Sequence, residues 1–280
     1  MHIPIPGGRV LRAVDGISLE LRRAETLGLV GESGSGKTMT AMAVMRLLEG
    51  PLANAVRGRI LLDGSDLLAL SETAMSDVRG RALGMVFQEP MTSLNPVMRI
   101  GRQIAEPLRR HLGLSSAEAT ARAEEMLALV KLPDPARAMR LYPHELSGGM
   151  RQRVMIAIAL ACRPAVLIAD EPTTALDVTI QAQILALMAE LQESLGTAIL
   201  LITHDLAVIA ETAHRVAVMY AGRIVEIAPV EALFDTPAHP YTQGLLASIP
   251  RIEPTRAASL HEIRGSIGDA VFRTGCAFAP

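Results

Sequence analysis

The residues GESGSGKT, Gly31 to Thr38, lie between an apolar run, TLGLV, and a run of helical character, MTAMAVMRLL. The spacing G-x-x-x-x-G-K-T between a strand and a helix is typical of a phosphate-binding loop, in which backbone N–H groups and the helix N-terminus face phosphate oxygens. The loop therefore predicts a nucleotide site. The residues expected to bind the phosphates are Gly31, Glu32, Ser33, Gly34, Ser35, Gly36, Lys37 and Thr38.

Lys37 is one of only two lysines among 27 basic residues, and the others are arginines. A compact ammonium can act as a point charge between the β- and γ-phosphates of a nucleotide, where a broad planar guanidinium would not fit. Thr38 would place its hydroxyl on Mg²⁺. The alternative is a glycine-rich turn with an exposed lysine, and the strand before it and the helix after it argue against that interpretation.

The segment AVLIADEP supplies acidic residues at the end of a second buried strand. Two adjacent carboxylates at a strand end are costly unless a cation or proton chemistry uses them. Asp170 is the candidate ligand of Mg²⁺ through its waters, and Glu171 is the candidate general base that activates the attacking water. A strand end solvated by two acids is the alternative, and the phosphate-binding loop in the same chain weighs against it.

The segment LSGGMRQRV predicts a second anion-binding helix N-terminus. Ser147 can cap a helix whose first turn exposes the N–H groups of Gly148 and Gly149. One chain does not need two such sites for one γ-phosphate. The economical explanation is that this terminus serves the nucleotide of another subunit in a two-fold, head-to-tail pair. Read alone, a capped basic helix is a common structural device.

Short apolar runs alternate with longer segments of helical period, which predicts an α/β protein with a mostly parallel sheet covered by helices. The expected strands are TLGLV, GRILLDG, ALGMVFQ, AVLIAD, AILLITH and RVAVMY. We expect a nucleotide-binding core over residues 1–90 and 155–235, with an antiparallel β portion at the amino end. A helical subdomain is inserted at 91–154, its segment SSAEATARAEEMLALV carrying its own serine cap, and a C-terminal extension covers 236–280.

Composition excludes several classes of function. The formal net charge of −2 gives no basic footprint for nucleic acid. Cys162 and Cys276 are too few for a disulfide framework, and no basic-then-apolar leader stands at the amino end, so we expect a reducing cytoplasm. The longest apolar run, VMIAIALAC, is well short of the roughly 20 residues that cross a bilayer. Any membrane role would therefore be carried out from the surface, through a partner.

With these motifs in order, the chain resembles the ATP-binding-cassette (ABC) ATPases. The resemblance covers GESGSGKT, the glutamine loop FQEP, the signature LSGGMRQR, the strand LIADEP, the loop TALD and the switch segment LITHD. It implies a P-loop NTPase core that binds and hydrolyses ATP with Mg²⁺. By resemblance, Gln88 touches Mg²⁺ or the lytic water, Asp177 crosses a dimer interface and His204 contacts the γ-phosphate. The implied catalytic residues are thus Glu171, His204 and Gln88, and the implied metal ligands are Thr38, Gln88 and Asp170.

Finer features are similar to the oligopeptide, dipeptide and nickel importer branch, namely FQEPMTSLNP, YPHELSGGM and HPYTQGLLASIPR. The resemblance implies an ATPase subunit on the cytoplasmic face of the inner membrane that drives solute uptake. Its implied partners are a second ATPase subunit, the same or related, two permease subunits and, indirectly, an external solute-binding protein. In that branch, cysteines of the C-terminal extension can bind an iron–sulfur cluster. The single Cys276 cannot hold a cluster that takes four thiolates, and Cys162 is interpreted as core packing.

Two departures from the family pattern stand out. The aromatic residue that stacks on adenine would fall near His2 or Ile3, where neither it nor its strand is visible in the sequence. Ala24 replaces a turn glycine at an expected mild cost in stability.

The alternatives are an ABC ATPase of DNA repair or translation and a non-catalytic cassette. The first would call for a basic face, a coiled-coil or zinc insertion or tandem cassettes, and intact Lys37, Glu171, Ser147 and His204 argue against the second.

Overall fold

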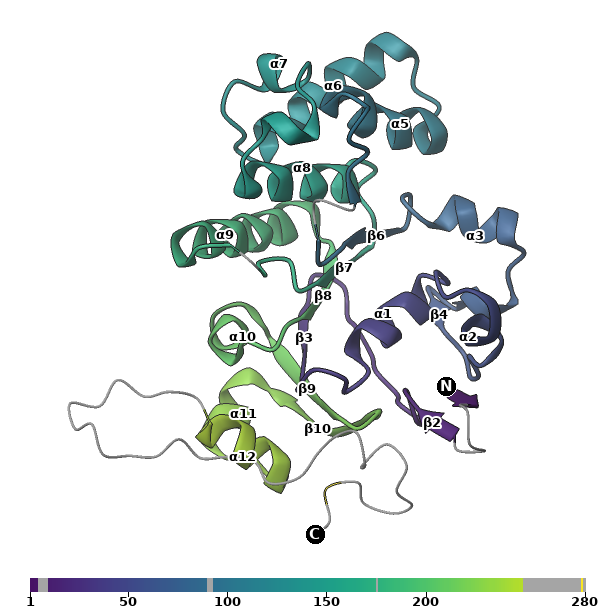
Figure 1. Ribbon diagram of the computed structural model, residues 1–280, viewed down its shortest axis with the longest axis vertical. Helices are drawn as coiled ribbons and strands as arrows, with labels where there is room; N and C mark the ends of the chain where they lie inside the picture. The colour runs from purple at the N-terminus through teal and green to yellow at the C-terminus, as the bar shows by residue number, and fades with distance from the viewer. Residues whose placement is uncertain (5–9, 90–92, 175, 249–277, 279–280) are drawn as a thin grey trace, which may run out of the picture. The chain divides into compact units, whose positions relative to one another are not determined.

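The computed structural model describes residues 1–4, 10–89, 93–174, 176–248 and 278 of the 280 residues (Figure 1). The chain divides into two compact units. The first holds the described residues of Met1–Glu20, Thr26–Leu68 and Ile202–Pro280, and the second holds those of Leu21–Glu25 and Ala69–Leu201. The domain boundaries expected from the sequence stay a prediction.

The first unit has strands at its centre and short helices around them. Its strands are β1 (His2–Pro4), β2 (Val10–Arg12), β3 (Thr26–Val30), β4 (Leu61–Leu62), β5 (Ser65–Asp66), β9 (Arg215–Tyr220) and β10 (Arg223–Pro229). Its helices are α1 (Lys37–Val44), α2 (Gly50–Asn54), α10 (Leu206–Thr212), α11 (Val230–Asp235) and α12 (Pro240–Ala247). A short 3-10 helix, η1 (Leu67–Ala69), ends the second segment of this unit.

Strands β10, β9 and β3 lie in that order in this unit. β3 is buried along its whole length and runs parallel to β9, with Leu27 opposite Arg215 and Val30 opposite Val218. β9 and β10 form an antiparallel hairpin through Ala221 and Gly222, both at positive φ, which matches the twist that two-residue hairpin turns require. The predicted strands TLGLV and RVAVMY are therefore confirmed.

Helix α10 packs closely on β3 because β3 carries a glycine. A Cβ atom at Gly28 would lie 2.6 Å from Cδ1 of Ile209, a residue with no exposed surface. Asp205 begins the helix by accepting hydrogen bonds from the N–H groups of Ala207 and Val208 at 2.9 and 3.3 Å. This packing fixes the end of β3 that leads into the phosphate-binding loop.

The apolar run of GRILLDG predicts one strand of the main sheet, but the segment does not form one. It forms part of a separate two-stranded sheet, in which Leu61 and Leu62 of β4 pair antiparallel with β5. Asp63 and Gly64 between the strands both have positive φ, and an Asp-Gly pair strongly favours such a tight turn. The turn reverses the chain before a longer strand can form.

The amino end forms the expected antiparallel β portion. His2–Pro4 pairs with Val10–Arg12, so that His2 lies opposite Arg12. The antiparallel portion is thus confirmed, and it supplies a strand upstream of the phosphate-binding loop that is not visible near His2 and Ile3 in the sequence. It was hidden because two prolines and two glycines interrupt the segment IPIPGG.

The second unit combines strands with the longer helices. Its strands are β6 (Leu83–Val86), β7 (Val166–Asp170) and β8 (Ala198–Ile202), which lie in the order β8, β7, β6. Its helices are α3 (Glu72–Val78), α5 (Ile100–Leu112), α6 (Ser116–Leu129), α7 (Pro135–Ala138), α8 (Gly148–Leu160) and α9 (Val178–Leu195), with a 3-10 turn η2 (Pro143–Glu145). β6 and β7 are parallel, with Leu83 opposite Val166. The three strands confirm the predictions from ALGMVFQ, AVLIAD and AILLITH.

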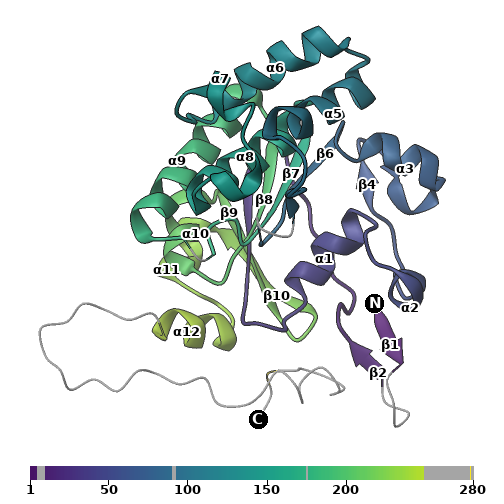
Figure 2. The same cartoon turned by 45° about the horizontal axis from the view of Figure 1, so that its top comes forward.

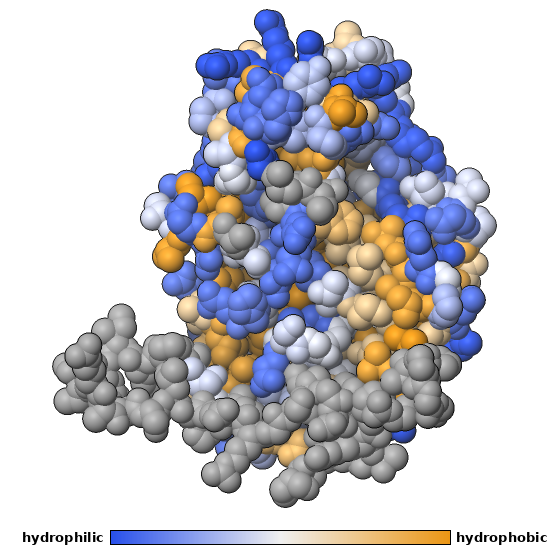
Figure 3. Space-filling view, viewed as in Figure 1, coloured by the Kyte–Doolittle hydropathy of each residue, from blue (hydrophilic) through white to orange (hydrophobic). Residues whose placement is uncertain are grey.

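Helices α5, α6, α7 and α8 gather beyond the ends of β6 and β7 (Figures 1 and 2). α5 buries Ile104 and Leu108 and exposes Arg109 and Arg110, so one face packs and the other meets water. Polar residues accordingly cover much of the visible surface of this region (Figure 3). α6 starts with the expected serine cap, because Ser115 accepts from the N–H of Glu118 at 3.3 Å and the carboxylate of Glu118 accepts from the N–H of Ser115 at 2.8 Å.

The fold class is therefore confirmed as α/β, with a mostly parallel main sheet, antiparallel strands at the amino end and helical content beyond the sheet. Within the described ranges, none of the helices has the length and apolar character needed to cross a bilayer.

Ala24 adopts the backbone conformation of the turn glycine it replaces. Its φ is +53°, in a turn where the N–H of Glu25 bonds the carbonyl of Arg22 at 3.2 Å. A left-handed conformation costs a residue with a Cβ roughly 1–2 kcal/mol, and glycine would remove this cost. The greater conformational freedom of glycine in the unfolded chain would offset part of the stability gained. We predict that Ala24→Gly raises the free energy of unfolding by about 0.5–1 kcal/mol in urea titrations.

The matched control is Ala121→Gly, at an exposed position inside α6. There the same change should lower the free energy of unfolding by about 1 kcal/mol. If Ala24→Gly and Ala121→Gly lowered the free energy of unfolding by similar amounts, the assignment of strain to Ala24 would be contradicted.

Candidate functional site

The phosphate-binding loop is shaped by close backbone contacts that only glycine permits. Gly31 follows β3 with a φ of +152°, and a Cβ there would lie 2.1 Å from the carbonyl oxygen of Met219. Gly36 precedes α1 with a φ of +107°, and a Cβ there would lie 2.3 Å from the carbonyl oxygen of Ala13. The loop is thus held by β3, by β9 and by Ala13 just after β2, all in its own unit, as a strand–loop–helix phosphate site requires.

Lys37 lies at the start of α1 with only 6% of its surface exposed. Its ammonium donates to the carbonyl oxygens of Gly31 at 2.6 Å and of Glu32 at 2.9 Å, and lies 3.5 Å from the hydroxyl of fully buried Ser35. Carbonyl and hydroxyl groups of the loop therefore surround the ammonium. The exposed-lysine alternative does not hold. Thr38, the next residue, is exposed.

In the second unit, β7 brings the two acidic residues to its end. Asp170 is 2% exposed, and Glu171 follows with a φ of +46°. The Oε2 atom of Glu171 accepts from the amide of Gln88 at 3.0 Å and from the hydroxyl of Thr174 at 2.9 Å. The structure therefore brings together two of the three predicted catalytic residues, Gln88 and Glu171.

The signature segment forms the predicted capped helix. Ser147 caps α8 by accepting from the N–H of Met150 at 3.4 Å, and Ser147 and Gly148 are exposed. A Cβ at Gly149 would lie 2.7 Å from Cγ2 of Ile180, so this glycine allows the first turn of α8 to approach α9. Asp177 caps α9 by accepting from the N–H of Ile180 at 2.9 Å.

The remaining predicted catalytic residue, His204, is exposed in the first unit, between the end of β8 and the start of α10. The roles of the predicted site residues stay predictions.

Two residues near these motifs were not predicted. Thr174 escaped notice because a threonine after DEP has no local pattern that links it to Glu171. The hydroxyl of Tyr241 accepts from the N–H of Glu32 in the phosphate-binding loop at 3.1 Å. In the sequence, HPYTQGLLASIPR is only a mark of resemblance, and nothing local connects residue 241 to residue 32.

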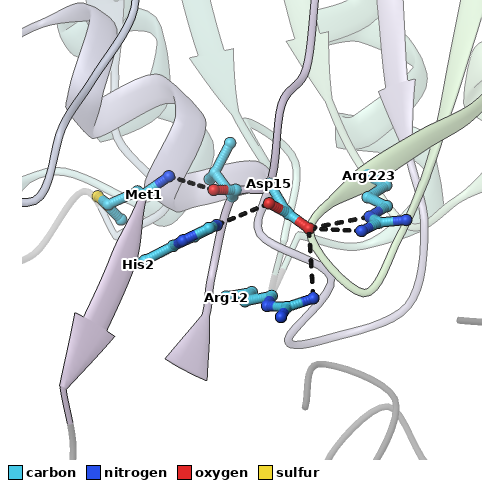
Figure 4. Close-up of polar contacts among 6 residues, drawn as sticks. Met1, His2, Arg12, Asp15 and Arg223 are labelled. Atoms are coloured by element: carbon cyan, nitrogen blue, oxygen red, sulfur yellow. Dashed lines mark hydrogen bonds and ion pairs between the residues drawn. The ribbon is translucent and has the colours of Figure 1, made fainter. Parts of the chain in front are cut away.

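His2, one of the positions expected near adenine, is part of a charged cluster at the amino end (Figure 4). Its Nε2 lies 2.6 Å from Oδ1 of Asp15, and Oδ2 of Asp15 accepts from Arg223 at 2.8 and 3.0 Å. The hydrogen bond with His2 and then those from Arg223 hold the pKa of Asp15 below its usual value, despite its partial burial. The N-terminal ammonium donates to the carbonyl of Val14, which also fixes β1.

Cys162 is a core residue, as predicted. It is 8% exposed, its Sγ lies 3.5 Å from the carbonyl oxygen of Pro107, and burial raises the pKa of the thiol. Cys276 lies outside the described residues.

Two family models match the chain. The model of the ABC transporter matches residues 14–174, which include the phosphate-binding loop, the signature and the strand with Asp170. The chain belongs to the ABC transporter family. The model of the oligopeptide/dipeptide transporter C-terminal region matches residues 225–280. The chain is therefore an ABC transporter ATPase that carries this C-terminal region, and the expectation from the sequence is confirmed.

Relatives cover most of the chain. A probable peptide ABC transporter ATP-binding protein of Sinorhizobium fredii, y4tR, is 54% identical over 96% of this chain and 81% of the relative. The oligopeptide transport ATP-binding protein OppD of Bacillus subtilis is 54% identical over 94% of this chain and 73% of the relative. The glutathione import ATP-binding protein GsiA of Salmonella paratyphi A is 55% identical over 90% of this chain and 41% of the relative.

Solved structures of ATP-binding cassettes share the fold. A dimeric, post-hydrolysis state of the cassette MJ0796 bound to ADP and Pi has a TM-score of 0.72 at 28% identity, covering 82% of this chain and 96% of that chain. The cassette cbiO1 of Clostridium perfringens has a TM-score of 0.70 at 27% identity, covering 84% of this chain and 88% of that chain. These matches favour a transporter ATPase over an ABC ATPase of DNA repair or translation.

The backbone contacts at Gly36 generate a prediction. A methyl group there would overlap the carbonyl of Ala13, at 2.3 Å, and would sit on a left-handed backbone. Gly36→Ala should therefore distort the loop and weaken ATP binding by tenfold or more. A loss of about 1.4 kcal/mol of binding free energy is enough for a tenfold change. Isothermal titration calorimetry would measure the dissociation constant.

The control is Gly113→Ala, which replaces another glycine of positive φ, where a Cβ would have nothing within 4 Å. It should cost only about 1 kcal/mol of stability and leave ATP affinity unchanged. Equal ATP affinities for Gly36→Ala and the unmodified chain would contradict the proposed contact.

Proposed function

We propose that this ABC ATPase binds and hydrolyses Mg²⁺-ATP to drive import of peptides or a similar small solute through two permease subunits. The observation that carries the proposal is the cluster of Gln88, Glu171 and Thr174 at the end of β7, in a chain with an intact phosphate-binding loop. Names of relatives that describe peptide, oligopeptide and glutathione import support the class of solute.

The chemistry of the predicted metal ligands fits Mg²⁺. Among the residues that the structure describes, no three His, Cys, Asp or Glu side chains are grouped to hold a metal. Mg²⁺ prefers oxygen donors and is usually bound by one or two carboxylates together with phosphates and water. The hydroxyl of Thr38, the amide oxygen of Gln88 and the buried carboxylate of Asp170 are donors of this kind. When bound, the ion would offset negative charge on the phosphates.

Each side chain has a distinct part in the proposed hydrolysis. Lys37 would leave the loop carbonyls for the β- and γ-phosphates, and Glu171 would take the proton of the attacking water. Gln88 and Thr174 both donate to Oε2 of Glu171, so they orient the carboxylate before substrate arrives. His204 would donate to the γ-phosphate.

A second ATPase subunit, the same or related, would complete each nucleotide site. Ser147 and Gly148 are exposed at the start of α8, where their N–H groups and hydroxyl can reach a nucleotide bound to another subunit. Val178 follows Asp177 with 83% of its surface exposed, which suits a position at a subunit interface. The dimeric cassette MJ0796 supports this arrangement.

The segment after the glutamine loop is the proposed contact with a permease. The buried amide of Gln103 accepts from the N–H of Asn95 at 2.9 Å and donates to the carbonyls of Asn95 and Met98 at 3.0 and 2.8 Å. It thereby fixes a loop on which Val97 is 83% exposed. An apolar side chain on a fixed loop suits docking to a membrane subunit. The ATPase would then lie on the cytoplasmic face of the inner membrane, with the external binding protein reached only through the permeases.

Glu171→Gln should abolish turnover and leave ATP binding intact. The substitution preserves the shape of the side chain and removes its ability to take a proton, which typically costs about 10² to 10⁴ in rate. Because ATP would then persist, light scattering should detect a stable ATP-dependent dimer.

The control is Glu190→Gln, which makes the same chemical change at an exposed ion pair with Lys131. Its steady-state rate should match that of the unmodified chain. Near-normal turnover by Glu171→Gln would show that Glu171 is not the general base. Stimulation of hydrolysis by DNA or RNA in the same assay would favour the repair or translation class instead.

A further inference from the structure

Tyr241 connects the C-terminal region of this chain to the phosphate-binding loop. It lies in the first turn of α12, which begins with Pro240 after His239, and Nδ1 of His239 accepts from the N–H of Tyr241 at 3.1 Å. The tyrosine has no exposed surface. It lies in the same compact unit as the loop.

Neighbouring residues fix the position of the tyrosine ring. Its centroid lies 4.4 Å from that of Tyr220, at the end of β9, and 5.5 Å from that of Phe278. The carboxylate of Glu226 in β10 accepts from the N–H groups of Ala238 and His239 at 2.8 and 3.0 Å, so the start of α12 is tied to the sheet. The hydroxyl of Tyr241 is thus carried on a rigid support.

That hydroxyl contacts one peptide group of the loop. The N–H of Glu32 donates to the hydroxyl of Tyr241 at 3.1 Å, and the carbonyl of the same peptide, that of Gly31, accepts from Lys37 at 2.6 Å. Gly31 has a φ of +152°, a region that glycine alone enters readily, so its own backbone restricts the peptide little. Two side chains on opposite ends of the peptide therefore set its orientation.

Nucleotide binding removes one of these two restraints. In the proposed function, Lys37 turns to the phosphates and releases the carbonyl of Gly31. The hydrogen bond from Glu32 to Tyr241 faces the other way and can persist. Burial is the main cause that raises the pKa of Tyr241, so the side chain is a neutral phenol, and its oxygen accepts from the N–H of Glu32.

We propose that Tyr241 is a positioning residue for nucleotide binding, which holds the Gly31–Glu32 peptide in place while Lys37 exchanges the loop carbonyls for phosphate. The C-terminal region, matched as a mark of oligopeptide and dipeptide transporters, thereby contributes to the ATP site of its own subunit. The inference rests on ATP binding at the phosphate-binding loop, as proposed above. Tyr241 acts through the loop and does not touch the nucleotide.

The test is Tyr241→Phe, which keeps the ring and its packing and removes only the hydroxyl. Titration calorimetry of the full chain should give affinities for Mg²⁺-ATP and for ADP that are weaker by roughly three- to tenfold, the loss expected of one hydrogen bond. Because ADP also occupies the loop, both nucleotides should be affected. Hydrogen exchange at the Glu32 amide should accelerate in the nucleotide-free variant, which tests the hydrogen bond itself.

The matched control is Thr242→Val, which removes a hydroxyl from the neighbouring buried residue of α12. Because the buried hydroxyl of Thr242 has no hydrogen-bond partner in the described structure, this variant should keep or raise the melting temperature and leave both nucleotide affinities unchanged. Equal affinities for Tyr241→Phe and the unmodified chain would overturn the inference alone. An unmodified chain that binds neither nucleotide would overturn the proposed function and this inference with it.

Discussion

The phosphate-binding loop depends on backbone contacts too close for any side chain. Gly31 approaches the carbonyl of Met219 in β9, and Gly36 approaches the carbonyl of Ala13 beyond β2. These contacts bring strands from distant parts of the sequence against the loop. The buried strand β3, the hairpin of β9 and β10 and the close packing of α10 on Gly28 all support this arrangement.

Carbonyl groups of the loop satisfy the hydrogen bonds of its lysine. Lys37 is nearly buried and donates to two carbonyls, so ATP must replace existing hydrogen bonds instead of pairing a free charge. Only the difference between the two sets of contacts contributes to affinity. Residues that hold the loop while this exchange occurs, such as Tyr241, therefore matter although they lie behind the nucleotide.

The local parts of the molecule were predictable from the sequence. Apolar runs marked β3, β6, β7, β8 and β9, and the pattern Ser-x-x-Glu marked the cap of α6. The features that were missed depend on tertiary contacts or on backbone conformation. The Asp63-Gly64 turn overrode an apolar run, β1 was hidden by prolines and glycines, and the contact between Glu32 and Tyr241 joins residues 209 positions apart. Resemblance implies only that Gln88 touches Mg²⁺ or the lytic water, and its hydrogen bond to Glu171 is a feature that the structure adds.

The loop requires a compact ammonium, and a comparison of ATP hydrolysis by Lys37→Arg, Lys37→Ala and the unmodified chain tests this requirement. Ser35 beneath the ammonium is fully buried and Lys37 is 6% exposed, so the loop has no room for a planar guanidinium. Both variants should lose about 10²-fold or more in rate, as when a phosphate-stabilising donor is removed, although arginine retains the charge. Hydrolysis by Lys37→Arg close to the rate of the unmodified chain would contradict this requirement.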